Sequence, residues 1–180
     1  ELAHWAKEPA YESPLIARGR DDAEDTGPMP WPLTRAEVTS LAAHDFVLCA
    51  PDPFTPPDLP GLRVSVETRP GHGTRWEQFA LPGLLRSWKA DVLFAPAYSG
   101  PLRCPVPTVV TIHDVSFSAH PEWFTRREGF RRRVLTRLTA RRAARIITDS
   151  EFSRGEIVLH LGISASRIDV IYPGATTPAA

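Results

Sequence analysis

The chain has 180 residues, of which 42% are hydrophobic, and its 21 Lys and Arg residues balance its 21 Asp and Glu residues. This composition is typical of a globular domain and excludes a disordered chain, while a net charge of zero excludes a general attraction to nucleic acid. No run of 18 apolar residues occurs, so the sequence has no segment typical of a membrane-spanning helix.

The beginning of the chain carries few folding signals. Residues 1–8 are expected to be the end of a helix, and residues 9–44 an insertion or irregular segment, because most of that stretch is polar, acidic and rich in Pro and Gly. Within it, residues 34–43 favour a short helix, with Thr34 as the N-cap and Glu37 as its capping-box partner.

Two strands and an interrupted helix follow. Apolar and β-favouring residues predict strands over 45–50 and 62–67, separated by a proline-rich loop over 51–60. Apolar residues at helical spacing predict a helix over 75–88, which Pro82 is expected to kink or split.

The second half of the chain alternates strands with helices. Strands are predicted over 91–95, 108–112, 145–148 and 167–172. Helices are predicted over 121–145, and from a Ser150 cap to about His160 with a stop at Gly162. The buried stripe expected for the longer helix consists of Phe130, Val134, Leu135 and Leu138. This alternation predicts an α/β fold, a Rossmann-like open parallel sheet with helices on both faces.

One of these strands ends in a polar, titratable pair. Residues 108–112 are all β-branched, and His113 and Asp114 follow them directly. Because ligands bind beyond the carboxyl ends of the strands in an open parallel sheet, the pair is a candidate site. The alternative is that both residues cap the strand and satisfy a loop.

Two other chemistries are not favoured by the sequence. Gly71-His72-Gly73 lies between a strand and a helix, but Trp76 stands where a dinucleotide-binding loop needs its third Gly, so no NAD is expected. A metal phosphohydrolase needs further ligands beside His113 and Asp114, and His120 and His160 form no obvious set, so no metal is expected.

Arginine is dense between residues 126 and 145, where Glu128 is the main acidic residue. A solvated helix face is the simpler interpretation. The alternative is attraction to an anionic membrane surface or to phosphate groups. Nucleic acid is not an expected partner, because Phe130 is the one aromatic residue inside this run that could stack on a base.

A second strand-to-helix turn lies at Asp149–Ser153. The free N–H groups at the start of a helix favour an anion. The alternative is an ordinary cap, in which Ser150 accepts a hydrogen bond from the amide of Ser153.

Several segments carry a family resemblance in their order and spacing over about residues 45–175. They are Trp76–Gln78, Leu81–Pro82, Ala90–Pro96, Val109–Phe117, His120–Phe124, Ala143–Ser153, Leu161–Ile163, Arg167–Ile168 and Val170–Gly174. Together they resemble the N-terminal, acceptor-side domain of bacterial retaining glycosyltransferases of the GT-B fold, the group 1 or family 4 type.

The resemblance implies one half of a GT-B fold and transfer of a hexose, with retention, from a nucleotide-sugar to a sugar, lipid or glycan acceptor. It implies that His113 is catalytic and contacts the donor sugar, with Asp114 orienting the loop or the imidazole. The other residues expected to bind substrate are Tyr98, Ser99, Ser116, Phe117, Ser150 and Glu151. No metal or other cofactor is implied, because protein groups neutralise the diphosphate in this family.

The cellular location follows from the same resemblance and from the cysteines. Cys49 and Cys104 show no disulfide framework or metal-ligand spacing, which suits a reducing compartment. We therefore expect a cytoplasmic protein, with peripheral contact to the inner membrane as the extension that the arginine-rich run suggests.

The chain departs from the family at both ends. Residues 9–40 match nothing in it, and residues 176–180 are expected to be the linker to a C-terminal nucleotide-binding domain that the chain lacks. We therefore expect residues 45–175 to be one domain of a longer enzyme, and this chain alone to be inactive. The alternative is a non-catalytic sugar-binding or partner-docking module of the same fold.

Overall fold

The computed structural model describes residues 44–56 and 62–173. The chain divides into two units, one formed by residues 1–67 and 174–180 and the other by residues 68–173. The expectations outside the described residues are those for 1–8, for 9–43 with its helix over 34–43, and for 176–180.

The described part of the first unit holds two paired strands. These are β1 (Asp45–Ala50) and β2 (Arg63–Thr68), which form a two-stranded sheet and confirm the two predicted strands. Arg63 Nε lies 2.9 Å from Asp45 Oδ1, and Ser65 Oγ donates to the carbonyl of Phe46 over 3.4 Å. The first contact joins the first residues of the two strands, and the second joins residues further along them.

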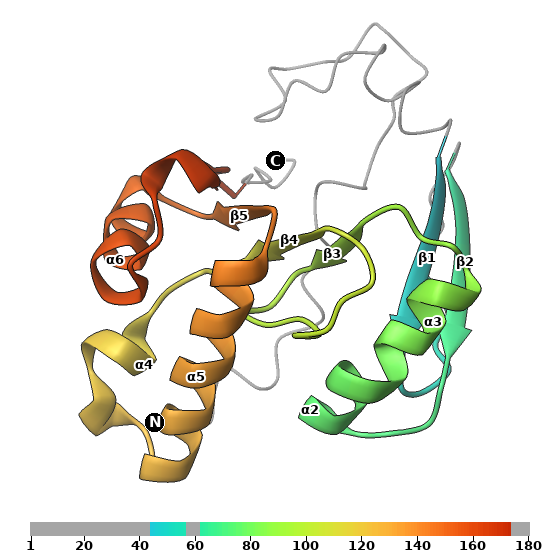
Figure 1. Ribbon diagram of the computed structural model, residues 1–180, viewed down its shortest axis with the longest axis horizontal. Coiled ribbons are helices and arrows are strands. Elements are labelled where there is room, and N and C mark those ends of the chain that lie inside the picture. The colour runs from blue at the N-terminus through green and yellow to red at the C-terminus, as the bar shows by residue number, and fades with distance from the viewer. Residues whose placement is uncertain (1–43, 57–61, 174–180) are drawn as a thin grey trace, which may run out of the picture. The chain divides into compact units, whose positions relative to one another are not determined.

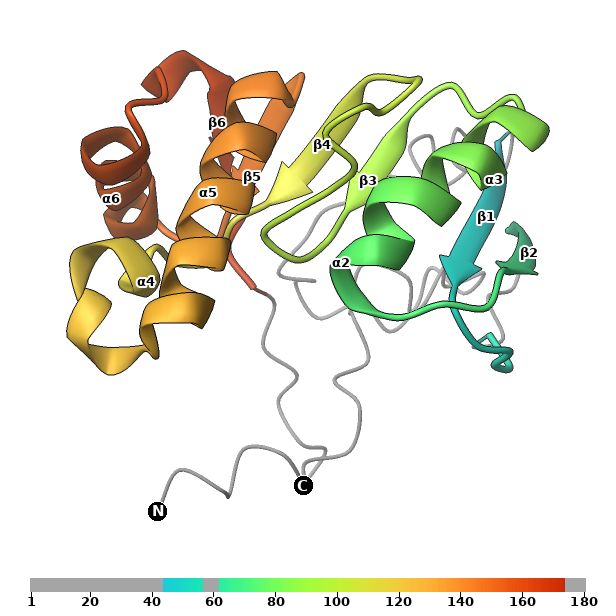
Figure 2. The same ribbon diagram turned by 60° about the horizontal axis from the view of Figure 1, so that its bottom comes forward.

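The second unit is built on a parallel sheet. Its strands are β3 (Leu93–Ala95), β4 (Thr108–Thr111), β5 (Arg145–Thr148) and β6 (Ile168–Val170). They are hydrogen-bonded in chain order, and every neighbouring pair is parallel (Figures 1 and 2). The predicted Rossmann-like α/β fold with a parallel sheet is therefore confirmed.

The helix before β3 is interrupted, as Pro82 predicted. It consists of α2 (Gly73–Arg75), a π-helical segment η1 (Trp76–Ala80) and α3 (Leu81–Ser87). A proline inside a helix has no N–H to donate and clashes with the carbonyl four residues earlier. The π segment, in which the N–H of Leu81 donates to the carbonyl of Trp76, widens the turn ahead of Pro82.

The predicted helix over 121–145 begins later than expected. Two short elements precede it, α4 (Ser116–Ala119) and the 3₁₀ turn η2 (Pro121–Trp123). Helix α5 (Arg126–Arg142) starts after Thr125, whose side chain accepts a hydrogen bond from the N–H of Glu128. This N-cap fixes the start of the helix.

The prediction for the buried side of α5 is wrong. The helix buries Gly129, Thr136, Thr139 and Ala140, whereas Phe130 and Val134 are 64% and 37% exposed. Leu135 and Leu138, the other members of the expected stripe, are half-buried. Thr139 Oγ1 lies 3.4 Å from the carbonyl oxygen of Gly100. Such a close approach favours small side chains on the inner side of the helix, so the large ones lie outside.

Helix α6 (Glu151–Leu161) agrees with its sequence signals. Ser150 caps its first turn, and Gly162 ends it in the left-handed conformation with φ of 68°, which glycine adopts without strain. The expected start and stop of this helix are therefore confirmed.

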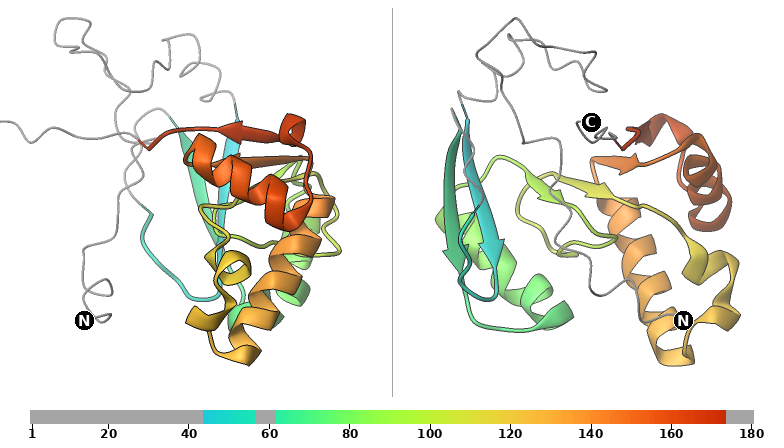
Figure 3. Two further views of the ribbon diagram at one scale, coloured as in Figure 1. Left: turned by 90° about the vertical axis from the view of Figure 1, so that its left-hand side faces the viewer. Right: turned by 180° about the vertical axis from the view of Figure 1, so that it is seen from behind.

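The core lies between the sheet and helices α5 and α6. Val110 and Ile146 of the sheet are fully buried with Ile157 of α6 and Ala140 of α5. Figure 3 shows α4, α5 and α6 on one side of β5 and β6. Phe94, at an alternate strand position, is 54% exposed. Among the described residues of this unit, helices cover the face of the sheet that packs on α5 and α6. Coverage of the opposite face by helices stays a prediction.

Candidate functional site

Parallel pairing brings the ends of three strands to one edge of the sheet. Thr111 of β4 is in register with Ile147 of β5, and Ala95 of β3 with Val110 of β4. His113 follows Thr111 by two positions, as Asp149 follows Ile147. The carboxyl edge of the sheet therefore gathers His113, Asp149 and the backbone of Pro96.

Both ring nitrogens of His113 face oxygen acceptors. Nδ1 lies 2.7 Å from Asp149 Oδ2, and Nε2 lies 3.1 Å from the carbonyl oxygen of Pro96. A neutral imidazole has one N–H, so only the doubly protonated ring donates to both oxygens. The side chain of His113 is 44% exposed, so its ring is oriented by these contacts and still open to a ligand.

Asp114 orients the loop rather than the imidazole. Its Oδ1 accepts from the backbone N–H of Ser116 over 2.7 Å, and its Oδ2 accepts from the hydroxyl of Tyr98 over 2.6 Å. Burial acts to raise the pKa of Asp114, but the hydrogen bonds from Ser116 and Tyr98 outweigh it and hold this pKa below its ordinary value. Asp114 is thus a stable anion that fixes the turn after β4. Of the two roles expected for it, the structure supports the first.

Tyr98 is held in an unusual backbone conformation. Its φ is 59°, in the left-handed region that costs a non-glycine residue about 1–2 kcal/mol. Its N–H donates to the carbonyl of Thr111, and its ring makes edge contacts with His113 and Phe117. Burial first, and then the hydrogen bond to Asp114, raise the pKa of the Tyr98 phenol, which therefore stays protonated. Tyr98 consequently forms one wall of the site, held by its backbone bond to Thr111, its hydroxyl bond to Asp114 and its ring contacts.

Phe117 and Ser116 contact the residues that surround His113. Phe117 is 2% exposed and belongs to the hydrophobic core, where it packs against Tyr98. The backbone N–H of Ser116 serves Asp114, and its side chain is half-buried at the start of α4. The structure therefore connects these two expected site residues to His113 through Tyr98 and Asp114.

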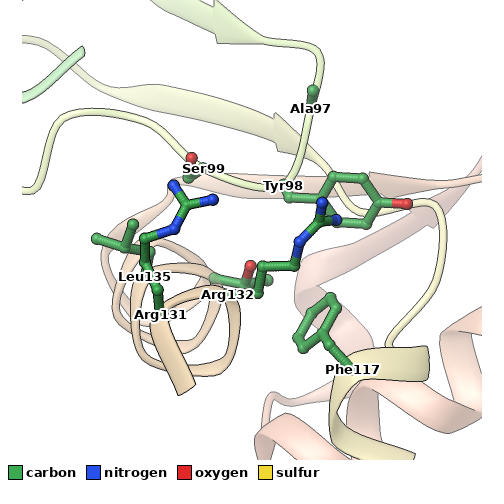
Figure 4. A pocket seen from close by; sticks show the side chains of 8 residues that line it. Ala97, Tyr98, Ser99, Phe117, Arg131, Arg132 and Leu135 are labelled. Carbon is green, nitrogen blue, oxygen red and sulfur yellow. The ribbon is translucent and has the colours of Figure 1, made fainter. Parts of the chain in front are cut away.

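A small cavity lies on the other side of Tyr98, between its loop and α5. It encloses about 150 Å³. Its lining residues are Ala97, Tyr98, Ser99, Phe117, Arg131, Arg132, Leu135 and Thr136. In Figure 4 the side chains of Arg131 and Arg132 rise from α5 toward the loop that carries Tyr98 and Ser99. His113 is not one of its lining residues, so the cavity and the edge with His113 are separate features.

The side chain of Ser99 bonds to the π-helical segment η1 and not to residues at the sheet edge. Its Oγ donates to Glu77 Oε2 over 2.7 Å. The neighbouring Gln78 spans the same loop, donating to the carbonyl of Gly100 and accepting from the N–H of Leu102. The polar residues of η1 thus fix the loop after β3.

Ser150 and Glu151 make the contacts of an ordinary helix start. Ser150 Oγ accepts from the N–H of Ser153 over 3.1 Å, and Glu151 pairs with Arg154 at 3.2 Å. Ser150 follows Asp149 directly, so the cap also fixes the residue that orients His113.

Sequence reasoning missed Asp149 as the partner of His113. The signal was present, because the strands that carry the two residues are neighbours in a parallel sheet and both residues follow their strands directly. It also missed Glu77 and Gln78 as supports of the loop, since contacts between elements so far apart leave no local pattern.

Among residues 44–56 and 62–173, no group of three or more His, Cys, Asp or Glu side chains could hold a metal ion. No helix within these ranges is long and apolar enough to cross a membrane.

The fold and the site define a Rossmann-like α/β domain with an oriented, half-exposed histidine at the carboxyl edge of its sheet. The family model described as Glycosyltransferase Family 4 matches residues 37–177. The chain belongs to this family, which confirms the resemblance found in its sequence. No curated protein matches the chain significantly.

One solved structure with detectable similarity is the "Crystal structure of Anabaena Alr3699/HepE in complex with UDP and glucose". It is 23% identical to the chain, with a TM-score of 0.40, and the match covers 66% of this chain and 34% of that one. The matched region thus spans about a third of that protein's length.

Proposed function

We propose that the chain is the acceptor-side domain of a retaining glycosyltransferase that moves a hexose from a nucleotide-sugar to a sugar, lipid or glycan acceptor. Membership of glycosyltransferase family 4 supports glycosyl transfer in general. The retaining outcome, the hexose and the acceptor classes extend the resemblance that the sequence carries. By the same resemblance, we assign the second half of the catalytic cleft to a nucleotide-binding domain outside these residues.

His113 is the observation that carries this proposal. Asp149 accepts from Nδ1 of its ring, which leaves Nε2 directed toward the carbonyl of Pro96 at the open edge. A sugar hydroxyl has both a donor and an acceptor, so it can replace the Pro96 contact at Nε2 in either protonation state of the ring. His113 would thereby fix the donor sugar by hydrogen bonding.

Such positioning suits glycosyl transfer. The reaction passes through an oxocarbenium-like state, in which hydrogen bonds to sugar hydroxyls orient the ring and strengthen as charge develops. Asp149 orients the histidine, while Asp114 and Tyr98 hold the adjoining loop. The diphosphate is then left to groups of the other domain, and no metal ion is assigned to this one.

The test is the kinetics of His113→Ala in the protein encoded by the complete reading frame. Product formation is measured against a panel of nucleotide-sugars. We expect kcat/KM to fall by roughly 10²–10³-fold, the usual loss for a group that stabilises developing charge. His160→Ala is the matched control, because His160 pairs with Glu156 at 3.3 Å at the opposite end of α6. It should keep wild-type turnover.

Three results would contradict the proposal. The first is wild-type transfer by His113→Ala, and the second is an equal loss in His160→Ala. The third is measurable turnover by residues 1–180 alone, which would mean that no second domain is needed. Saturable sugar binding without turnover of any donor would instead support a non-catalytic binding module.

A further inference from the structure

Helix α5 has its large apolar residues on the outside. Its inner side consists of Gly129, Thr136, Thr139 and Ala140, none of which is large. Phe130 and Val134, one helical turn apart, are 64% and 37% exposed on the opposite side. Adjacent exposed apolar side chains that are surrounded by polar ones are typical of an interaction surface.

This outer side is also strongly basic. The helix contains eight arginines and one glutamate, and that glutamate, Glu128, is already paired with Arg132 at 2.8 Å. Among the described residues, no carboxylate pairs with Arg127, Arg137 or Arg141, which flank the apolar line. We define the outer α5 face as these exposed residues: Arg127, Phe130, Val134, Arg137 and Arg141.

We propose that the outer α5 face docks on an anionic membrane surface. The 17-residue helix is about 25 Å long and presents one continuous line of contact along that length. Phe130 and Val134 would enter the boundary between headgroups and acyl chains, and the arginines would pair with lipid phosphates. Arginine stems also cover apolar surface while their guanidinium groups stay at the headgroup level.

Charge and apolarity together select this occupant. An acidic protein or a nucleic acid would satisfy the arginines, but neither requires an apolar line through the centre of the basic face. Single-stranded nucleic acid would in addition need several aromatic residues for stacking, and Phe130 is the one aromatic residue of α5. A lipid surface is the partner that uses both features of the helix.

The charge requirement is tested by flotation of the chain with vesicles. The anionic vesicles contain equal parts of phosphatidylglycerol and phosphatidylcholine, and the neutral ones contain phosphatidylcholine alone. We expect salt-sensitive binding to the anionic vesicles only. Reversing Arg127, Arg137 and Arg141 to Glu should weaken it roughly hundredfold or more, at about fivefold for each arginine lost near a charged surface.

The matched control reverses three other exposed arginines, Arg75, Arg86 and Arg103, and so changes the net charge equally. This variant should bind within about threefold of the wild type, because its substitutions lie off the outer α5 face. An equal loss in the control would mean that net charge alone drives binding. Equal binding to neutral vesicles would also overturn the proposal.

The apolar requirement is tested with Phe130→Ser. This variant should bind anionic vesicles at least tenfold more weakly and keep the wild-type melting temperature, because the side chain is exposed in the free protein. Undiminished binding would indicate contact through charge alone, as with nucleic acid or an acidic protein. A melting temperature several degrees lower would mean that the chain itself covers Phe130. Either result would overturn the proposal, and neither bears on the kinetics of His113.

Discussion

The sheet edge around His113 and the outer α5 face are both polar and exposed, yet their polar groups are satisfied differently. At the edge, His113, Asp149, Asp114 and Tyr98 bond to one another or to the backbone within 3.1 Å. On α5, several arginines have no acidic partner among the described residues. The site around His113 therefore has its geometry set by contacts within the chain. The outer α5 face has charges that the chain itself does not pair.

The two regions also use phenylalanine in opposite ways. Phe117 is 2% exposed beneath the edge, and Phe130 is 64% exposed on α5. Phe117→Ala should lower the free energy of unfolding by about 3–5 kcal/mol, as expected for a truncated core phenylalanine. Phe130→Ala should change it by less than about 0.5 kcal/mol. Urea unfolding of both variants checks the contrast, and similar losses would remove it.

Asp149 tests whether orientation of His113 matters for catalysis. In the complete enzyme, Asp149→Ala should lower kcat roughly 10–100-fold, because the ring loses the acceptor at Nδ1 and turns more freely. Asp149→Asn keeps an oxygen acceptor and should lose less. Unchanged kcat in both variants, with His113→Ala impaired, would show that the ring needs no partner.

Tyr98→Phe tests the hydrogen bond that holds Asp114. The variant should lose about 1–2 kcal/mol of stability near neutral pH, toward the low end because Asp114 is half-exposed. The pKa of Asp114 is held below its ordinary value, so its contribution is present above about pH 4 and is lost as the pH falls through the lowered pKa. Without the Tyr98 hydroxyl, the pKa of Asp114 rises toward its ordinary value, and the contribution of Asp114 to stability becomes smaller.

The measurement for this prediction is urea unfolding of wild type and Tyr98→Phe from neutral pH down to acid. The difference in unfolding free energy should begin to narrow near pH 4. It should become small once the pH lies below the lowered pKa, where Asp114 is protonated in both proteins. A difference that stays constant with pH would show that the hydroxyl does not act through this carboxylate.

Ser150→Ala should have a smaller effect than the variants of Phe117, Asp149 and Tyr98. It removes the side-chain oxygen that caps α6, which costs about 1 kcal/mol. Thermal unfolding measures the loss, and Ser150→Asp, which keeps a cap acceptor, should restore it. A loss in Ser150→Asp as large as in Ser150→Ala would assign the effect to something other than capping.

Local signals predicted those elements whose causes are local. The β-branched run before His113, the Ser150 cap and Gly162 correctly gave β4 and both ends of α6, and Pro82 correctly predicted an interrupted helix. The fold class followed from the order of these elements, because alternating strands and helices leave few topologies.

The inner side of α5 and the partner of His113 depend on tertiary packing. An apolar line at helical spacing predicts a stripe but does not say which side approaches the sheet, and at Gly129 and Ala140 close packing selects small residues. The pairing of His113 with Asp149 depends on which strands are neighbours and in what register. The position of His113 at the sheet edge was predictable, because it depends only on the strand that precedes it in the sequence.

The most direct test is a crystal structure of the complete enzyme with an intact, non-transferable nucleotide-sugar. We expect His113 Nε2 within about 3.2 Å of a hydroxyl oxygen of the sugar, with Nδ1 still bonded to Asp149. A sugar bound elsewhere, with the His113 ring still on the Pro96 carbonyl, would contradict the central claim that this histidine holds the transferred sugar.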